Sequence, residues 1–183
     1  MKHRSLKFVF PALVIALVFS GCESKTSASK FDGNSWTSRT LAESMTLCGQ
    51  NLTYPLTVES LGEDFNISEA ESNGTGSTVN LLYNGDDVGV LRFECAPDMV
   101  TGATAASRFI FIPDDDQLEL LSVNGFTAKD SLETAKKKIG EPTEEKGMTL
   151  YYKTSDNGKL EIIEGTGQKI YAINLYFDTG NNV

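Results

Sequence analysis

The chain has 183 residues, with 16 lysines and arginines against 25 aspartates and glutamates, which gives a formal net charge of −9 at pH 7. A nucleic-acid-binding protein needs a basic face that displaces counterions from phosphates, so this composition argues against nucleic acid as a partner. It also argues against a domain that clamps directly onto anionic lipid headgroups.

Residues 1–22 have the three parts of an export signal. Three basic residues precede an apolar stretch at residues 8–19, and the small pair Ser20-Gly21 follows at a cleavage point. A transmembrane helix needs about 20 apolar residues, and this stretch is much shorter. We therefore expect a cleaved signal rather than a membrane span.

A cysteine follows the small pair directly. The sequence Phe19-Ser20-Gly21-Cys22 resembles the lipobox of bacterial lipoproteins, in which the thiol receives a diacylglyceryl group before cleavage leaves the cysteine as the first residue. The resemblance implies an acyl anchor on Cys22 that holds the chain on the extracytoplasmic face of the cell membrane, or on the outer membrane of a two-membrane cell. Each buried methylene contributes about 0.8 kcal/mol, so two acyl chains would suffice. The alternative is a plain secretory signal with a leftover cysteine.

Removal of residues 1–22 would leave 161 residues with 13 basic and 25 acidic side chains, a net charge of −12. A chain of this length forms one ordinary domain or two small ones and buries roughly 70% of its unfolded surface. Cys48 and Cys95 would then be an even pair in an exported chain. They form either one disulfide or two separate buried thiols.

The polar segment at residues 23–44 is typical of a flexible tether, with Trp36 as an exception that packs on the domain or rests at the membrane interface. Residues 45–183 are expected to form the folded domain. Its first half is predicted to begin with a hairpin at 46–54 around Gly49-Gln50-Asn51 and a short helix at 58–61 that ends at Gly62. A second hairpin is predicted next, with strands at 78–83 and 88–94 around Asn84-Gly85. Two further strands are predicted at 108–112 and 118–123, around the acidic turn 113–116.

The second half is predicted to begin with a helix capped by Asp130, with Glu133 as its capping-box partner, and ended by Gly140 and Pro142. Lysines 136–138 are expected on the solvated face of this helix. The residues expected on its apolar face are Leu132, Ala135 and Ile139. Three strands are predicted to follow, at residues 149–154, 160–164 and 170–177.

The segment from Gly125 through this helix to Pro142, with the strands ending at Phe177, looks like the helix-and-sheet unit of SmpA/BamE-type envelope lipoproteins and of the β-lactamase inhibitor protein. The resemblance implies an α+β fold, with short helices packed on an antiparallel sheet. It also implies a role in protein contacts, without catalytic residues to carry over. One interpretation is that residues 45–123 and 124–183 are two tandem copies of this unit.

The residues offer little for catalysis. The single histidine, His3, lies in the leader, so histidine-based nucleophile systems and imidazole metal sites are not expected. The densest carboxylate cluster is Asp114, Asp115, Asp116 and Glu119, which we interpret as a solvated turn rather than a glycosidase pair or a calcium site. No cofactor and no metal site is predicted.

Together these features predict a lipid-anchored binding or scaffolding lipoprotein that contacts another envelope protein and is not an enzyme. One alternative is a carboxylate-dependent hydrolase of glycans. A second is an accessory lipoprotein that binds a solute.

Overall fold

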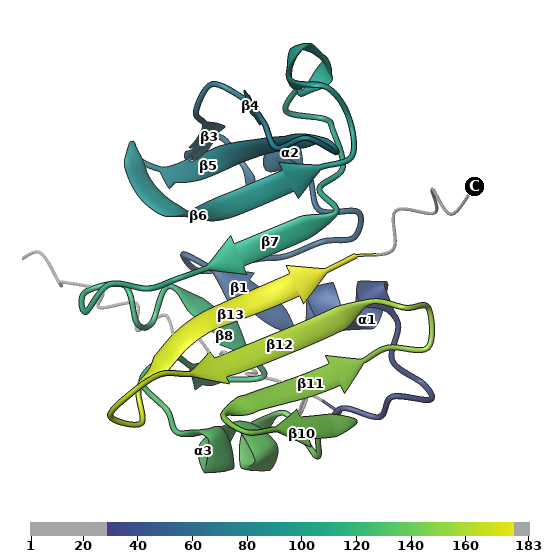
Figure 1. Cartoon of the computed structure of the whole chain (residues 1–183), viewed down its shortest axis with the longest axis vertical. Helices are drawn as coiled ribbons and strands as arrows, with labels where there is room; N and C mark the ends of the chain where they lie inside the picture. The colour runs from purple at the N-terminus through teal and green to yellow at the C-terminus, as the bar shows by residue number, and fades with distance from the viewer. Residues whose placement is uncertain (1–28, 178–183) are drawn as a thin grey trace, which may run out of the picture.

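The computed structural model describes residues 29–177 of the chain. Within that range a nine-stranded antiparallel sheet dominates, in the order β10-β11-β12-β13-β7-β6-β5-β3, with β4 paired to β5 (Figure 1). Its strands are β3 (Phe65–Ile67), β4 (Glu71–Ser72), β5 (Ser77–Tyr83), β6 (Asp86–Phe93), β7 (Arg108–Phe111), β10 (Glu144–Lys146), β11 (Thr149–Lys153), β12 (Lys159–Glu164) and β13 (Ile170–Tyr176).

A second, smaller sheet has the order β2-β1-β8-β9. It contains β1 (Met45–Leu47), β2 (Gln50–Asn51), β8 (Leu121–Val123) and β9 (Phe126–Thr127). The short helices are α1 (Ser38–Glu43), α2 (Val58–Leu61), α3 (Leu132–Lys138) and one 3₁₀ turn at Pro97–Met99. The α+β class is therefore confirmed, although the sheets dominate and the helices are small.

The core lies on one face of the large sheet. Because side chains alternate along a strand, Phe109 and Phe111 of β7 point to this covered face and are almost completely buried. Leu41 of α1, Met45 of β1 and Phe126 of β9 are equally buried in the same cluster. Figure 1 shows the small sheet and α1 behind the large sheet, whereas no helix of residues 29–177 lies in front of it. Within these residues, one face of the large sheet is therefore left open.

Three tight hairpins have two successive residues with positive φ at their turns, as the favoured two-residue hairpin loops require. The predicted turn at Asn84-Gly85 is confirmed, with φ of 52° and 93°. The first hairpin turns at Cys48-Gly49 rather than at residues 49–51, with φ of 50° and 82°. Asn124-Gly125 joins β8 to β9 in the same way.

The expectation of a flexible tether up to residue 44 is wrong for its last part. Trp36 is 4% exposed and its ring contacts Phe31 edge-on, and α1 follows with its N-cap at Thr37. Phe31 also donates a backbone hydrogen bond to the carbonyl of Ile139. The few apolar residues of this segment are spaced so that they fill the core, and most polar side chains between residues 32 and 44 are exposed, with Ser38 as the buried exception.

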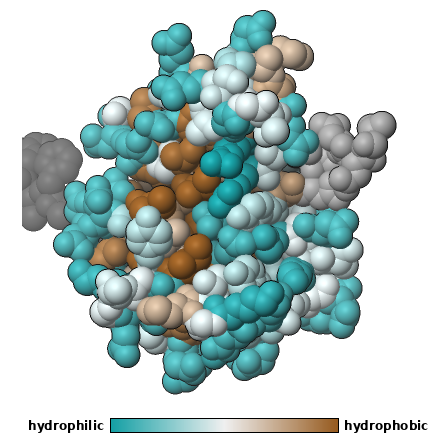
Figure 2. Space-filling view, viewed as in Figure 1, coloured by the Kyte–Doolittle hydropathy of each residue, from teal (hydrophilic) through white to brown (hydrophobic). Residues whose placement is uncertain are grey.

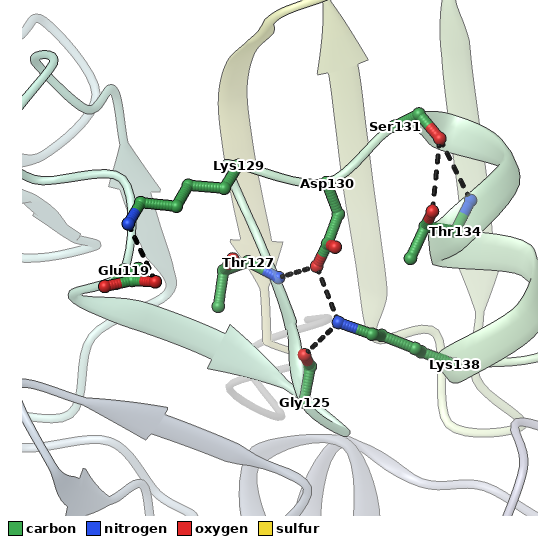
Figure 3. Close-up of polar contacts among 8 residues, drawn as sticks. All are labelled: Glu119, Gly125, Thr127, Lys129, Asp130, Ser131, Thr134 and Lys138. Carbon is green, nitrogen blue, oxygen red and sulfur yellow. Dashed lines mark hydrogen bonds and ion pairs between the residues drawn. The ribbon is translucent and has the colours of Figure 1, made fainter.

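The residue that caps the start of α3 differs from the one predicted from the sequence (Figure 3). Ser131, not Asp130, is the N-cap, and its hydroxyl accepts from the backbone N–H of Thr134. Asp130 accepts from the backbone N–H of Thr127 and pairs with Lys138 at 2.8 Å. Lys138 also donates to the carbonyl of Gly125, so this lysine fastens α3 to the β8–β9 hairpin.

The helix at 58–61 with its end at Gly62 is confirmed, and so are the three strands after α3. The sequence did not reveal β10, which has only three residues and carries two glutamates and a lysine. The strands flanking the acidic turn do not pair with each other: β7 joins the large sheet and β8 the small one. The turn therefore connects the two sheets instead of closing a hairpin.

Candidate functional site on the open face of the large sheet

The open face of the large sheet is formed by the side chains that alternate with the buried ones. In β7 these are Arg108 and Ile110, which flank the buried Phe109. Strand pairing continues the row of Ile110 across the sheet through Asn174 and Glu161 to Tyr151. The row that contains Arg108 runs parallel to the row of Ile110 and is displaced from it by two residues along each strand. Neighbouring strands lie about 4.8 Å apart, so side chains within such a row can touch.

One half of the open face is apolar. Figure 2 shows hydrophobic residues gathered on one half of the face and hydrophilic residues on the other. We call the first group the apolar patch: it consists of partly exposed aliphatic side chains on β5, β6, β7 and β12 and just after β7, namely Leu82, Val90, Ile110, Ile112 and Ile163. Ile112 is 52% exposed. Contiguous apolar patches on a soluble surface commonly mark an interaction site.

A groove of about 680 Å³ lies at the edge of the apolar patch. Its lining includes the aliphatic side chains of Val90, Ile110 and Ile112. Four carboxylates border it, from the start of β6 and from the acidic turn: Asp86, Asp87, Asp114 and Asp116. Gln117 bridges these two segments, because its amide donates to the carbonyl of Asp87 at 2.8 Å.

The other half of the open face contains a polar group that we call the central cluster: Arg108, Lys159, Glu161, Asn174 and Tyr176. Glu161 is its hub, with a side chain only 12% exposed. One carboxylate oxygen pairs with Lys159 at 2.6 Å, and the other accepts from the Tyr176 hydroxyl at 3.0 Å and the Asn174 amide at 3.2 Å.

These contacts determine the ionisation of the cluster. Partial burial alone would raise the pKa of Glu161, but the hydrogen bonds from Lys159, Tyr176 and Asn174 outweigh it and lower that pKa. Burial, followed by the hydrogen bond to Glu161, raises the pKa of Tyr176 to about 12. At neutral pH the carboxylate is therefore charged and the phenol keeps its proton and donates it.

Two buried polar atoms of the central cluster have no hydrogen-bond partner within residues 29–177, the Oδ1 atom of Asn174 and the Nε atom of Arg108. Asn174 as a whole is 4% exposed. Buried polar atoms are almost always paired in folded proteins, so two such atoms on adjoining strands make this region unusual. The cluster is chemically equipped for binding: it offers cations, an aromatic ring and unused hydrogen-bonding capacity.

Cys22 lies outside the described residues, so its predicted acylation remains a prediction. Cys48 and Cys95 are both free thiols in the structure. Cys48 occupies the β1–β2 turn, and burial raises the pKa of its thiol to about 11. A thiol with so high a pKa is a poor nucleophile at neutral pH.

The acidic run 114–119 does not act as one site. Asp115 pairs with Lys169 at 3.2 Å and Glu119 with Lys129 at 2.8 Å, whereas Asp114 and Asp116 face the groove. Across the part of the chain that the structure describes, no group of three or more histidine, cysteine, aspartate or glutamate side chains could hold a metal ion. Within the same residues no helix is both long and apolar enough to cross a membrane.

Sequence reasoning did not single out the central cluster. Its residues come from three strands that are up to 68 positions apart in the chain, and only the pairing of β7 with β13 and of β13 with β12 brings them together. The available signal was the alternation within each strand: Arg108 and Tyr176 each alternate with buried apolar residues.

No family model and no curated protein matches the chain. One solved structure that resembles it is a DUF4309 family protein (YjgB) from Bacillus subtilis, with 13% sequence identity and a TM-score of 0.33. The match covers 63% of this chain and 66% of the Bacillus protein, just under two thirds of the latter.

Proposed function

We propose that this chain is a lipid-anchored extracytoplasmic lipoprotein that binds another envelope protein through the open face of its large sheet. The observation that carries the proposal is the open face itself, where an apolar patch lies beside a charged cluster that has unused hydrogen-bonding groups. Protein interfaces typically combine such an apolar region with polar and aromatic groups.

The position of the predicted anchor is consistent with this role. Phe31 contacts Trp36 and the buried ring of Tyr152, which points to the covered face of the large sheet. The chain therefore enters the domain on the side opposite the open face. From Cys22 to Phe31 there are nine residue steps, which span at most about 30 Å. An acylated Cys22 would hold the domain close to the membrane and leave its open face accessible.

Photo-crosslinking in cells tests the proposal. A photoreactive residue at Ile110, in the apolar patch, should give a defined protein adduct, while the same residue at Lys137, an exposed position on α3, should not. Equal crosslinking from both positions, or none from Ile110, would contradict it. Cys22→Ala should release the protein into the medium, and continued membrane retention would refute the anchor.

The carboxylate hydrolase has its best placement in the groove that Asp86, Asp87, Asp114 and Asp116 border. A binding surface explains more of the face, because the central cluster and two residues of the apolar patch, Leu82 and Ile163, do not line this groove. We therefore keep binding as the proposed activity.

We also propose that the two halves of the domain are diverged copies of one unit. In each half a two-stranded hairpin precedes a short helix and a run of antiparallel strands of the large sheet: β1–β2 with α2 and the five strands β3 to β7, and β8–β9 with α3 and the four strands β10 to β13. The halves adjoin through β7 with β13 and β1 with β8. If the halves correspond in this way, the boundary between them lies before Leu121 and not after residue 123. Fragments divided between Asp115 and Asp116 should then reassemble on co-expression, whereas a cut between Val123 and Asn124 separates β8 from β9 and should prevent it.

A further inference from the structure

A row of cations crosses the polar half of the open face. Strand pairing places these residues side by side on six neighbouring strands, in the order Thr78, Arg92, Arg108, Tyr176, Lys159 and Lys153. Four of the six are basic in a chain whose net charge is −9. We call this set the cationic row. Such a local concentration of one charge on an oppositely charged protein favours a partner of opposite sign at this place.

Tyr176 divides the cationic row into two hollows. The guanidinium carbon of Arg108 lies 4.3 Å from the centre of its ring, and the Lys159 ammonium lies 4.0 Å from it. A hollow of about 300 Å³ on one side is lined by Arg92 and Arg108. The hollow on the other side, of about 450 Å³, is lined by Lys153 and Lys159. Tyr176 lines both, so each hollow combines two cations with an aromatic wall.

The arginine hollow is the stronger anion site. Arg92 and Arg108 are directly paired across β6 and β7, where two like charges repel each other. Glu94 also lines this hollow, but one carboxylate against two guanidinium groups leaves an excess positive charge. An anion between the two arginines would relieve the repulsion, and a guanidinium fork binds carboxylates in a bidentate manner. In the lysine hollow both ammonium groups already have ion pairs, Lys159 with Glu161 and Lys153 with Glu144.

Building on the proposed function, we propose that the partner presents an acidic, apolar peptide segment to the cationic row, with one carboxylate bound between Arg92 and Arg108. The adjoining row explains why a peptide fits better than a phosphate polymer. It contains Val90 and Ile110, which contact aliphatic side chains well, and Glu161, which repels a dense polyanion. A segment with both acidic and apolar side chains matches both rows.

The spacing of the hollows specifies the segment further. Their midpoints are three strand spacings apart, about 14 Å, and an extended chain rises about 3.3 Å per residue. Acidic side chains four residues apart would therefore reach both hollows. The probe is a fluorescein-labelled, C-terminally amidated peptide, Asp-Val-Leu-Val-Asp, titrated with the full-length protein in detergent micelles and followed by fluorescence anisotropy.

We expect Arg92→Gln and Arg108→Gln each to weaken binding at least fivefold, and Lys137→Gln, which removes the same charge from α3, to leave it unchanged. Glu94→Gln should tighten binding severalfold, a gain that misfolding cannot produce. The amide peptide Asn-Val-Leu-Val-Asn should bind at least fivefold more weakly. Near-UV circular dichroism checks that Tyr176 keeps its environment in Arg108→Gln.

Equal affinities for Arg108→Gln and Lys137→Gln, or weaker binding by Glu94→Gln, would overturn the proposal. Tighter binding of inorganic polyphosphate than of the acidic peptide would overturn it in favour of a phosphate polymer. The crosslinking experiment separates this inference from the proposed function: an adduct from Ile110 that persists in Arg92→Gln/Arg108→Gln keeps the open face as the docking site and rejects only the acidic segment.

Discussion

The carboxylate of Asp156 accepts hydrogen bonds from the backbone N–H of Ser38 with both of its oxygens, each at 2.9 Å. The two residues are 118 positions apart in sequence. The Ser38 hydroxyl adds a third bond at 3.1 Å, and Thr154 donates at 2.6 Å from the same turn. A negative charge at the start of α1 is favourable because the first N–H groups of a helix lack partners. This contact fastens the N-terminal segment to the turn between β11 and β12.

Asp156→Asn should therefore destabilise the domain. The amide keeps one acceptor oxygen but loses the charge, and hydrogen bonds to charged groups contribute about 1.5–3 kcal/mol, so we expect a loss of about 1–2 kcal/mol in the free energy of unfolding. Urea denaturation measures it. Asp115→Asn is the matched control, since the Asp115 side chain is 90% exposed and its ion pair with Lys169 is on the surface. Equal midpoints for the two variants would contradict the role of Asp156.

Because of the same contact, the free energy of unfolding should depend on pH in the acidic range. Burial works to raise the pKa of Asp156, but the bonds from Thr154 and Ser38 outweigh it, so the folded-state pKa lies below the usual 3.8. A lowered pKa gives stability that is present above pH 3.8 and is lost as the pH falls through the folded-state value. The stability difference between the wild type and Asp156→Asn should therefore be constant near neutrality and shrink below pH 3.8. A difference that grows in acid would contradict this assignment.

The hairpin at Asn84-Gly85 gives a prediction about backbone conformation. Asn84 has φ of 52°, a region in which a β-branched residue is strained. Asn84→Val should lower the free energy of unfolding by about 1–2 kcal/mol, whereas Asn84→Gly should be nearly neutral. Thermal unfolding of the two variants measures the difference, and equal melting temperatures would contradict the expected strain.

This hairpin also illustrates what could be predicted from the sequence. The pair Asn84-Gly85 predicts a turn because few residue pairs adopt positive φ at both positions, so the local sequence determines the structure here. Cys48-Gly49 makes the same kind of turn, but a cysteine is an uncommon residue at positive φ. The turn predicted from the sequence was therefore placed one residue too late, at residues 49–51. At Ser131 two good capping residues stand side by side, and the tertiary bond of Asp130 to Lys138 determines which of them caps.

The candidate site depends on pairing over long distances in the chain. The order β12-β13-β7-β6 brings Glu161, Tyr176 and Arg108 together, and no local pattern specifies that β7 lies next to β13. The folding of Trp36 into the core has a similar cause, since its ring partner Phe31 lies in the same polar segment and Phe31 in turn contacts the remote Tyr152. Composition alone describes that segment as a tether. Contacts with the sheet make it part of the domain.

The thiol of Cys48 should be almost unreactive in the folded protein. Burial raises its pKa from 9.0 to about 11, which lowers the thiolate fraction at pH 8 about a hundredfold. In a Cys22→Ala/Cys95→Ala chain, Cys48 is the only thiol. Its reaction with a disulfide reagent at pH 8 should be about a hundredfold slower in the native protein than in denaturant. Similar rates in the two states would show that the turn does not bury the sulfur.

Titration of Tyr176 tests the electrostatics of the central cluster. Burial and the hydrogen bond to Glu161 raise its pKa from 10.0 to about 12, so the wild type should show a phenolate absorbance step near pH 12 that Tyr176→Phe lacks and that the exposed-residue control Tyr171→Phe keeps. Glu161→Gln should move the step toward lower pH, because the carboxylate no longer favours the protonated phenol.

The raised pKa of Tyr176 also has a consequence for stability. A group whose folded-state pKa exceeds its unfolded value contributes stability below the unfolded value, and this contribution is lost as the pH rises through the folded value. The difference in the free energy of unfolding between the wild type and Tyr176→Phe should therefore fall between pH 10 and pH 12. Urea midpoints followed by far-UV circular dichroism measure this difference at each pH. A difference that stays constant across that window would mean that the phenol ionises as easily in the folded chain as in the unfolded one, and that Glu161 does not hold its proton.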